Sequence, residues 1–323
     1  MPERVLTNHD IQKIVDTSDE WIVERTGIHE RRIASDDETA SSLGTAAATE
    51  ALVHAKLDPS EIDLIICSTI SPDMQFPATA SIIQNAIGCI KAAAFDLGAG
   101  CAGFAYAAAI AAQLVASGGF RKVLVVGSDV LSKSLDWTDR TTCVLFGDGA
   151  GAVVIAEVEE GQGFLGFDLG SDGSGSELLK VPAGGSRHPA THETVDARQH
   201  YIQMDGKEVF RFAVKVMGES AERALAKCGM TSTDVDLFVP HQANVRIIDS
   251  AMRRLNLPPD KVYVNVGHYG NTSAASIPIA LHEAYYKGLI RQGDTIVTVG
   301  FGAGLAWASC VLRWTLPTIS AQV

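Results

Sequence analysis

The chain has 323 residues, of which 46% are hydrophobic and 20% are charged, and its 30 glycines follow no fixed period. This composition excludes a disordered protein and a collagen-like one. With 38 acidic and 26 basic residues the net charge is −12, so general affinity for a nucleic-acid backbone is not expected. An acidic partner would need a local basic patch.

The cysteines and the apolar stretches predict a cytoplasmic protein. The first residues, MPERVLTNHDIQKIV, lack the apolar core of a signal peptide. The most apolar stretch, residues 102–115, is shorter than the roughly 20 residues that a membrane span needs. The six cysteines form no CxxC pair or other ligand-spaced set, so we expect neither disulfides nor a metal site.

Short apolar runs alternate with helix-like segments along the chain. Most of these runs are continuous rather than alternating, which is typical of strands that helices cover on both faces. The sequence therefore predicts an α/β layer fold. The predicted strands are 62–70, 91–97, 122–129, 152–158, 235–240, 261–266, 294–300 and 305–314.

Two parts of the sequence resemble each other at a constant offset. Residues 51–68 align without gaps with 224–241, an offset of 173 positions. The same offset of 173 places 123–127 on 296–300. We interpret the two matches as structurally equivalent α/β halves, and the alternative is two unrelated α/β stretches. The predicted halves are 1–160 and 161–323.

One predicted strand of the second half has no counterpart in the first half. The run GFLGFDLG at 163–170 predicts a strand, and an offset of 173 places its partner before residue 1. Loss of such a strand from inside a sheet would leave the backbone of its neighbours unpaired. The hypothesis is that the native reading frame starts upstream of Met1 and that the first half here lacks its first strand.

Cys101 is the candidate nucleophile of the first half. It follows the predicted strand 91–97 in the segment DLGAGCAGFAYAAAI, where a long alanine-rich helix begins. A thiol at a helix N-terminus feels the positive end of the helix dipole, which lowers its pKa. Gly98, Gly100 and Gly103 leave room for a substrate beside the backbone. The alternative is a buried structural cysteine.

His241 and Asn271 are the candidate partners in the second half. Each follows a predicted strand and precedes a helix, which is where α/β sheets carry functional groups. The alternatives are a satisfied surface or core histidine and a plain turn asparagine. If a pseudo-twofold axis relates the halves, these loops converge on Cys101. Cysteine, histidine and asparagine make a nucleophile with two neutral hydrogen-bonding partners.

Two glycine-rich loops, FGDGAGA at 146–152 and VGFGAGLA at 299–306, could indicate nucleotide binding. A dinucleotide-binding fold needs a helix after such a loop. Both loops precede predicted strands instead, which excludes phosphate binding at a helix N-terminus. The exposed backbone N–H groups of the second loop suit an oxyanion hole.

Taken together, these motifs resemble the β-ketoacyl-ACP synthase III group of the thiolase-like condensing enzymes. PHQAN and GNTSAAS at this separation, with an upstream cysteine among small residues, form a specific combination. Elongating condensing enzymes carry Cys-His-His, so the asparagine points to the initiating branch. The resemblance implies a thiolase-like fold with layered αβαβα architecture. The matching segments are 17–28, the Cys101 segment, 123–130, 145–152, 239–248, 268–276 and 301–309.

The resemblance implies a two-step Claisen condensation that initiates fatty-acid synthesis and needs no cofactor. Cys101 would take the acyl group from an acyl-CoA primer, acetyl-CoA or a similar one, and release CoA. Malonyl-ACP would then lose CO2, and its carbanion would attack the acyl-cysteine. His241 and Asn271 would donate hydrogen bonds to the malonyl thioester oxygen. The backbone N–H groups of Cys101 and Ala303 would hold the acyl oxyanion.

The resemblance also implies where CoA and a second subunit bind. The CoA contacts would include an adenine held between Trp21 and Arg140. The alternatives are an ordinary half-buried aromatic for Trp21 and a surface salt bridge for Arg25. Phe76 would close the acyl pocket across the interface of a homodimer. The implied CoA contacts are Thr17, Trp21, Arg25, Arg140 and Asn244.

The acyl carrier protein is strongly acidic, so it would bind a cationic surface despite the overall charge of −12. Helical spacing places five cations on two predicted helices near the active-site entrance. A solvated helix face is the alternative. The five residues are Arg211, Lys215, Arg246, Arg253 and Arg254.

Three other functions compete with this one. A relative from specialised metabolism would use another starter acyl-CoA or another acceptor. A Cys-His-Asn hydrolase would use the same residues, although the papain-type CGSCW signature is absent. A non-catalytic acyl-binding subunit would not need all three candidate groups, which are present here.

Overall fold

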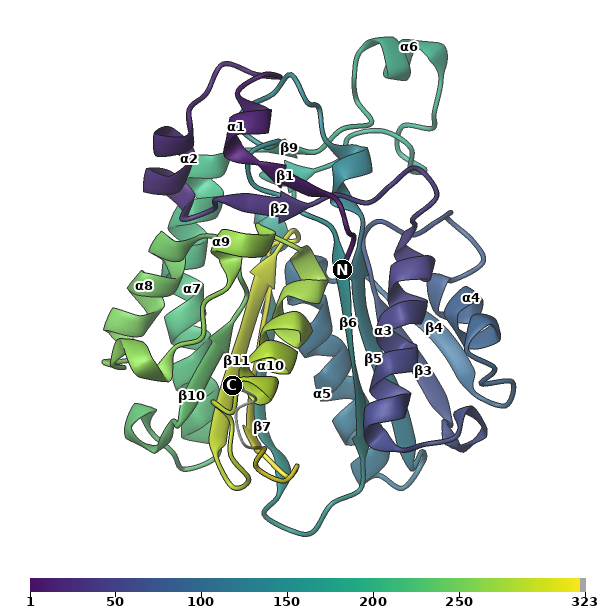
Figure 1. The fold of residues 1–323 in the computed structure, drawn as a ribbon, viewed down its shortest axis with the longest axis vertical. Coiled ribbons are helices and arrows are strands. Elements are labelled where there is room, and N and C mark those ends of the chain that lie inside the picture. The colour runs from purple at the N-terminus through teal and green to yellow at the C-terminus, as the bar shows by residue number, and fades with distance from the viewer. Residues whose placement is uncertain (320–323) are drawn as a thin grey trace.

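The structure is a computed structural model that describes residues 1–319. Two four-stranded sheets lie on either side of a pair of central helices, and further helices cover the outer faces (Figure 1). This arrangement confirms the predicted α/β fold of five layers. Short antiparallel pairs lie above the sheets: β1 (Val5–Thr7) with β2 (Glu30–Arg32), and β8 (Leu179–Lys180) with β9 (Gln203–Met204).

The sheet of the first half has the strand order β4-β3-β5-β6. The two central strands, β3 and β5, are parallel and almost completely buried, because helices cover both faces of the sheet. This burial explains their continuous apolar sequence. β6 is antiparallel to β5. The strands are β3 (Leu64–Ser68), β4 (Ala93–Leu97), β5 (Lys122–Asp129) and β6 (Gly149–Ala156).

The sheet of the second half has the strand order β10-β11-β12-β7. β10 and β11 are parallel, and β12 and β7 continue the sheet in antiparallel fashion. The glycine-rich segment at 299–306 covers the end of β11, the turn at 303–305 and the first residue of β12, so a strand follows it, as the sequence predicts. The strands are β7 (Gly163–Ser171), β10 (Leu237–Pro240), β11 (Thr295–Gly302) and β12 (Ala306–Arg313).

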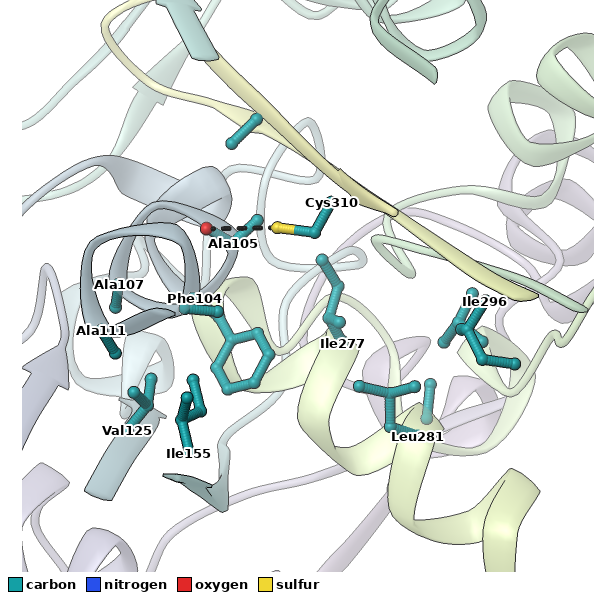
Figure 2. Packing of buried hydrophobic residues seen from close by; sticks show 14 of the residues in the cluster. Phe104, Ala105, Ala107, Ala111, Val125, Ile155, Ile277, Leu281, Ile296 and Cys310 are labelled. Atoms are coloured by element: carbon teal, nitrogen blue, oxygen red, sulfur yellow. Dashed lines mark hydrogen bonds between the residues drawn. The ribbon is translucent and has the colours of Figure 1, made fainter. Parts of the chain in front are cut away.

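The central helices carry the largest part of the core. Figure 2 shows Phe104 and Ile277, from the two central helices, among residues of both sheets such as Val125 and Ile296. Small side chains on α5 let the two sheets approach it closely. Within residues 1–319, no helix is long and apolar enough to cross a membrane. The layers consist of α3 (Ala40–Ala55) and α4 (Thr79–Ala86), then α5 (Gly103–Ala116) and α10 (Ser276–Tyr286), then α7 (Gly206–Lys227) and α8 (Val245–Arg254).

The bounds of several elements repeat along the chain. β5 and β11 are both eight residues long and start 173 positions apart, at Lys122 and Thr295. The short 3₁₀ turns before the central helices, η2 (Gly100–Ala102) and η7 (Ser273–Ala275), are also 173 positions apart. The halves therefore share a plan, although the division at residue 160 stays a prediction. The remaining helices are α1 (Asn8–Ile11), α2 (Asp19–Thr26), α6 (His192–Asp196) and α9 (Val266–Tyr269).

The two sheets differ at one edge. In the second half β12 pairs with β7 along its length, whereas β6 is an edge strand among residues 1–319. A groove of about 300 Å³ lies beside β6, between α3 and α10. Its walls carry mostly small or apolar side chains, together with the exposed group Glu50, His54 and His282.

The prediction of a strand at 261–266 is wrong. Only Val262 bridges to β10, and Tyr263 N donates to Phe238 O at 2.9 Å. The buried Gln242 side chain then accepts hydrogen bonds from the backbone N–H groups of Asn265 and Val266, at 2.9 and 3.2 Å. These bonds take the backbone away from the sheet, and α9 begins there. Asn271 consequently follows a short helix and not a strand.

Candidate active site

The three candidate residues line one cavity of about 90 Å³ at the ends of the two central helices. Cys101 comes from the first half, and His241 and Asn271 come from the second. All three side chains are buried, with exposures of 5%, 1% and 8%. The cavity is otherwise walled mainly by apolar groups such as Phe210 and Phe301. It is therefore a small, mainly apolar cavity, in which hydrogen bonds to a developing charge act more strongly than in water.

Cys101 lies in the 3₁₀ turn that leads into α5, and glycines allow another loop to approach it. A Cβ atom on Gly302 would lie 2.6 Å from the backbone nitrogen of Cys101, and a Cβ on Gly100 would lie 2.9 Å from that of Ala303. Gly100 also has a φ of +55°, which favours glycine. The close approach brings the backbone of Ala303 beside Cys101, as an oxyanion hole made of both N–H groups requires.

The expectation of a lowered Cys101 pKa is wrong. Burial of the thiol raises its pKa to about 12, because the thiolate would lose its hydration. The dipole of α5 acts in the opposite direction. The thiol is therefore protonated at neutral pH in the free protein, and it needs a proton acceptor when it reacts.

His241 begins the loop after β10, and its backbone N–H donates to Val299 O at 2.7 Å. Burial lowers the pKa of the imidazole to about 3, because the charged form would be desolvated. The ring is therefore neutral at physiological pH. Its edge-on contact with Phe301, at 5.2 Å between ring centroids, holds it in the cavity wall.

Ser276 holds the other side of the His241 ring, and the sequence analysis missed this residue. Ser276 Oγ lies 2.6 Å from His241 Nδ1, and both groups are buried. A hydroxyl both donates and accepts hydrogen bonds, so Ser276 pairs with either neutral tautomer. When its O–H donates to Nδ1, the proton of His241 is on Nε2. The only sequence signal is a serine at the first position of a buried helix.

Asn271 lies between two segments that fix its backbone. Asn271 N donates to Leu145 O at 2.9 Å, and Gly147 N donates to Asn271 O at 3.0 Å. The side-chain oxygen Oδ1 accepts a hydrogen bond from Ser273 N at 2.9 Å. This bond orients the amide group, so its Nδ2 is the donor that remains for a ligand in the cavity.

Known proteins share this chain's sequence almost end to end. The family model described as 3-oxoacyl-(acyl-carrier-protein) synthase III matches residues 95–173, and the model of its C-terminal part matches 225–314. The beta-ketoacyl-(acyl-carrier-protein) synthase III of Caldanaerobacter subterraneus subsp. tengcongensis is 57% identical over 315 residues, which are 98% of this chain and 95% of that protein. The chain belongs to the β-ketoacyl-ACP synthase III family. It is therefore an acyl-transferring condensing enzyme, and the resemblance in the sequence is confirmed.

Solved structures agree with this membership. The 3-oxoacyl-(acyl-carrier-protein) synthase III of Aquifex aeolicus is 48% identical, covers 97% of each chain and superposes with a TM-score of 0.90. The priming β-ketosynthase of the R1128 polyketide pathway is 40% identical, covers 98% of this chain and 94% of its own, and also has a TM-score of 0.90. The thiolase-like fold is thus common to both kinds of enzyme.

The residues expected to bind CoA form one surface cluster on the synthase. The guanidinium groups of Arg25 and Arg140 lie 4.7 and 5.4 Å from the centre of the Trp21 ring. Thr17 lies in the same segment, and its buried hydroxyl has no hydrogen-bond partner among residues 1–319. Asn244 Nδ2 donates to Arg25 O at 2.9 Å, which ties this cluster to the start of α8. An adenine between Trp21 and Arg140 requires the exposed Arg140 side chain to move outward.

The five cations expected at the carrier-protein surface are not equally available. Arg254 pairs with Glu222 at 2.8 Å and with Glu219 at 3.5 Å. Arg211 pairs with Glu208 at 2.7 Å. Within the described residues, the exposed cations Lys215, Arg246 and Arg253 have no such ion pair, and Arg246 packs over the ring of Phe210.

Phe76 does not line the cavity of its own chain. Its side chain is 82% exposed, and Met74 and Ile70 are exposed on the same loop. Ile90 and Phe95, near the edge strand β4, are exposed as well. Exposed apolar residues on and around an edge strand, here β4 among residues 1–319, are typical of a protein–protein interface.

Proposed function

We propose that the synthase condenses a short acyl-CoA primer with malonyl-ACP to give 3-oxoacyl-ACP, CO2 and CoA, without a cofactor. The observation that carries this proposal is the combination of a thiol, a neutral buried imidazole and an oriented carboxamide in one small cavity. Neutral donors stabilise an enolate without readily protonating it. A cavity of about 90 Å³ favours a primer as small as acetyl-CoA.

In the first step Cys101 takes the acyl group. The sulfur attacks the thioester carbon, the bond to the CoA sulfur breaks, and the thiol proton passes through His241 to the departing CoA thiolate. The backbone N–H groups of Cys101 and Ala303 stabilise the tetrahedral oxyanion. Ser276 supports the imidazole as the proton is exchanged, because its hydroxyl pairs with either tautomer.

In the second step malonyl-ACP loses CO2. Between the two steps His241 exchanges its Nδ1 proton for one on Nε2 through solvent, and Ser276 then donates to Nδ1. The electron pair of the broken C–C bond moves to the thioester, where His241 Nε2–H and Asn271 Nδ2–H donate to the enolate oxygen. The carbanion then attacks the acyl carbon, and the bond to the Cys101 sulfur breaks. The thiolate takes a proton from solvent to complete the cycle. Cys101 is thus used in both steps, whereas Asn271 acts only in the second.

The partners follow from the exposed surfaces. The acidic carrier protein would approach Arg246, Lys215 and Arg253, whose charges are not balanced by ion pairs within residues 1–319. A second copy of the chain would cover the apolar surface around Phe76 and β4. We place this homodimer in the cytoplasm, because all six cysteines are free thiols.

Incubation with radiolabelled acyl-CoAs of several chain lengths, with and without malonyl-ACP, tests the proposed function. We expect a labelled enzyme with acetyl-CoA alone, and labelled 3-oxoacyl-ACP when malonyl-ACP is added. Hydrolysis to free acid as the only product would favour a hydrolase and contradict the proposal. Preference for a long or branched starter acyl-CoA would favour the alternative of an enzyme from specialised metabolism. The likeness to the R1128 priming enzyme is the observation that supports this alternative.

A further inference from the structure

Arg31 is a completely buried arginine outside the catalytic cavity. It lies in the middle of β2, with an exposed fraction of 0%. Its guanidinium donates to Leu6 O at 3.2 Å, Asn8 Oδ1 at 2.8 Å and Val144 O at 2.7 Å. None of these acceptors is a carboxylate. Burial without an ion pair is costly, and it lowers the pKa of Arg31 to about 10.

The Val144 carbonyl that Arg31 holds is directly next to the segment that pairs with Asn271. Leu145 O and Gly147 N make the two backbone hydrogen bonds to Asn271, and Phe146 between them forms a parallel bridge with it. The position of the 145–147 segment therefore sets the position of Asn271. Arg31 holds this segment through the carbonyl of Val144, the residue directly before Leu145, which makes the first hydrogen bond to Asn271.

The stem of Arg31 also packs against both sides of this pairing. A Cβ atom on Gly147 would lie 3.1 Å from the Cβ of Arg31, and a Cβ on Gly270 would lie 3.2 Å from it. Gly270, which immediately precedes Asn271, has a φ of +64°. Backbone oxygens lie closer still, Tyr269 O at 2.3 Å from the first Cβ and Leu145 O at 2.9 Å from the second, so neither position has room for a side chain. Position 31 and the glycines at 147 and 270 are therefore closely packed.

We propose that Arg31 is a positioning residue for the decarboxylation step. Its guanidinium and stem hold the 145–147 segment against Gly270 and Asn271, and this keeps the Asn271 amide aimed into the cavity. The role is specific to the second step, because Cys101 and its oxyanion loop are held by other contacts. The inference rests on the function proposed above for Asn271.

The test compares two half-reactions in Arg31→Met and Arg31→Lys. Acylation is the transfer of label from acetyl-CoA to Cys101, and decarboxylation is the release of labelled CO2 from malonyl-ACP. We expect Arg31→Met to acylate at the wild-type rate and to release CO2 about 10–100-fold more slowly, since a displacement of about 1 Å costs up to about 100-fold. Arg31→Lys keeps the charge but loses the forked guanidinium donor. Its rate of CO2 release should therefore lie between those of the wild type and of Arg31→Met.

The neighbouring arginine supplies a matched control. Arg32 lies on the same strand but contacts Pro2 O and Glu3 O, at 3.5 and 3.3 Å, on the side of the chain terminus. We expect Arg32→Met to keep both half-reactions. If Arg31→Met does not fold, as judged by near-UV circular dichroism, the less drastic Arg31→Lys carries the test.

Asn271→Ala separates failure of this inference from failure of the proposed function. Wild-type CO2 release by the folded Arg31 variants, together with slow release by Asn271→Ala, would overturn the role of Arg31 alone. An equal loss of both half-reactions in Arg31→Met would also overturn it, because a general packing defect affects both steps. Wild-type CO2 release by Asn271→Ala would remove the function assigned to Asn271, and the inference with it.

Discussion

The two halves of the synthase use the same backbone plan for different chemistry. The 3₁₀ turns η2 and η7 are 173 positions apart, and each leads directly into a central helix. The first turn carries the thiol of Cys101, whereas the second follows Asn271 and precedes Ser276, which holds His241. A duplicated architecture thus brings two helix starts to one cavity, and only one of them supplies the nucleophile. The other half supplies the side-chain hydrogen bonds, from His241 and Asn271.

The largest expected effect comes from removing the thiol of the first half. Cys101→Ser should reduce condensation by at least about 10⁴-fold, as is typical when an enzyme loses its nucleophile. No stable acyl-enzyme should form, and mass spectrometry of the intact protein after incubation with acetyl-CoA measures this. Another buried cysteine, Cys143, supplies the control, since Cys143→Ser should still be acylated. Acylation of Cys101→Ser at the wild-type level would place the nucleophile elsewhere.

A smaller effect is expected from the hydroxyl that supports His241 in the second half. Ser276→Ala leaves Nδ1 of the buried imidazole without its partner, which loosens the ring and removes control over its tautomer. We expect the rate of decarboxylation to fall about 10–100-fold with little change in the KM for malonyl-ACP. Steady-state kinetics checks this. A rise in KM with unchanged kcat would show that Ser276 affects binding and not chemistry.

The neutral state of His241 has a consequence for stability. Its pKa is about 3 in the folded protein and near 6.5 when unfolded, so the unfolded chain binds the extra proton between these values. The free energy of unfolding should therefore fall by up to about 1.4 kcal/mol for each pH unit below 6.5 on account of this group. Denaturant unfolding of the wild type and of His241→Gln between pH 5 and 7 measures the difference. Parallel pH profiles of the two proteins would contradict a buried neutral imidazole.

The smallest expected effect is on thermal stability, and it concerns the edge strand β6, which lacks the neighbour that β7 provides for β12 within residues 1–319. Met1 lies beside Gly149 at the start of β6, so we expect a strand fused to Met1 to enter the groove antiparallel to β6, as β7 lies against β12. We expect the β7 sequence, GFLGFDLGS, placed before Met1 through a short linker, to raise the melting temperature by a few degrees. A version with prolines at its third and sixth positions cannot pair fully and should give no increase. Equal melting temperatures for both would show that the groove does not accept a strand.

The sequence predicts the fold and the convergence of the three central residues on one cavity, because each depends on local patterns. Continuous apolar runs mark buried strands, and Cys101, His241 and Asn271 each stand in a distinctive motif. The failures depend on contacts between distant residues. Gln242 captures the backbone of the predicted strand 261–266, and full burial reverses the expected direction of the Cys101 pKa. No sequence pattern near Gln242 or Cys101 predicts the lost strand or the raised pKa.

The supporting residues were missed for a related reason. Ser276 is one of several small polar residues in SAAS, and only the structure shows its hydroxyl against His241. Arg31 stands in a charged run, ERR, which is typical of an exposed surface, yet it is completely buried. Of the cations, the pairing of Arg211 with Glu208 follows helical spacing and could have been predicted. The pairs of Arg254 with Glu219 and Glu222 join two helices and could not.

The most direct test of the division of labour is to measure both half-reactions in Asn271→Ala. The account predicts that this variant acylates Cys101 from acetyl-CoA at the wild-type rate but releases CO2 from malonyl-ACP about 10²–10³-fold more slowly, the usual effect of losing one donor to a developing oxyanion. Asn265→Ala, in the preceding loop, serves as the control. Slow acylation with normal CO2 release in Asn271→Ala would contradict the account, because Asn271 would then serve the acylation of Cys101 and not the enolate.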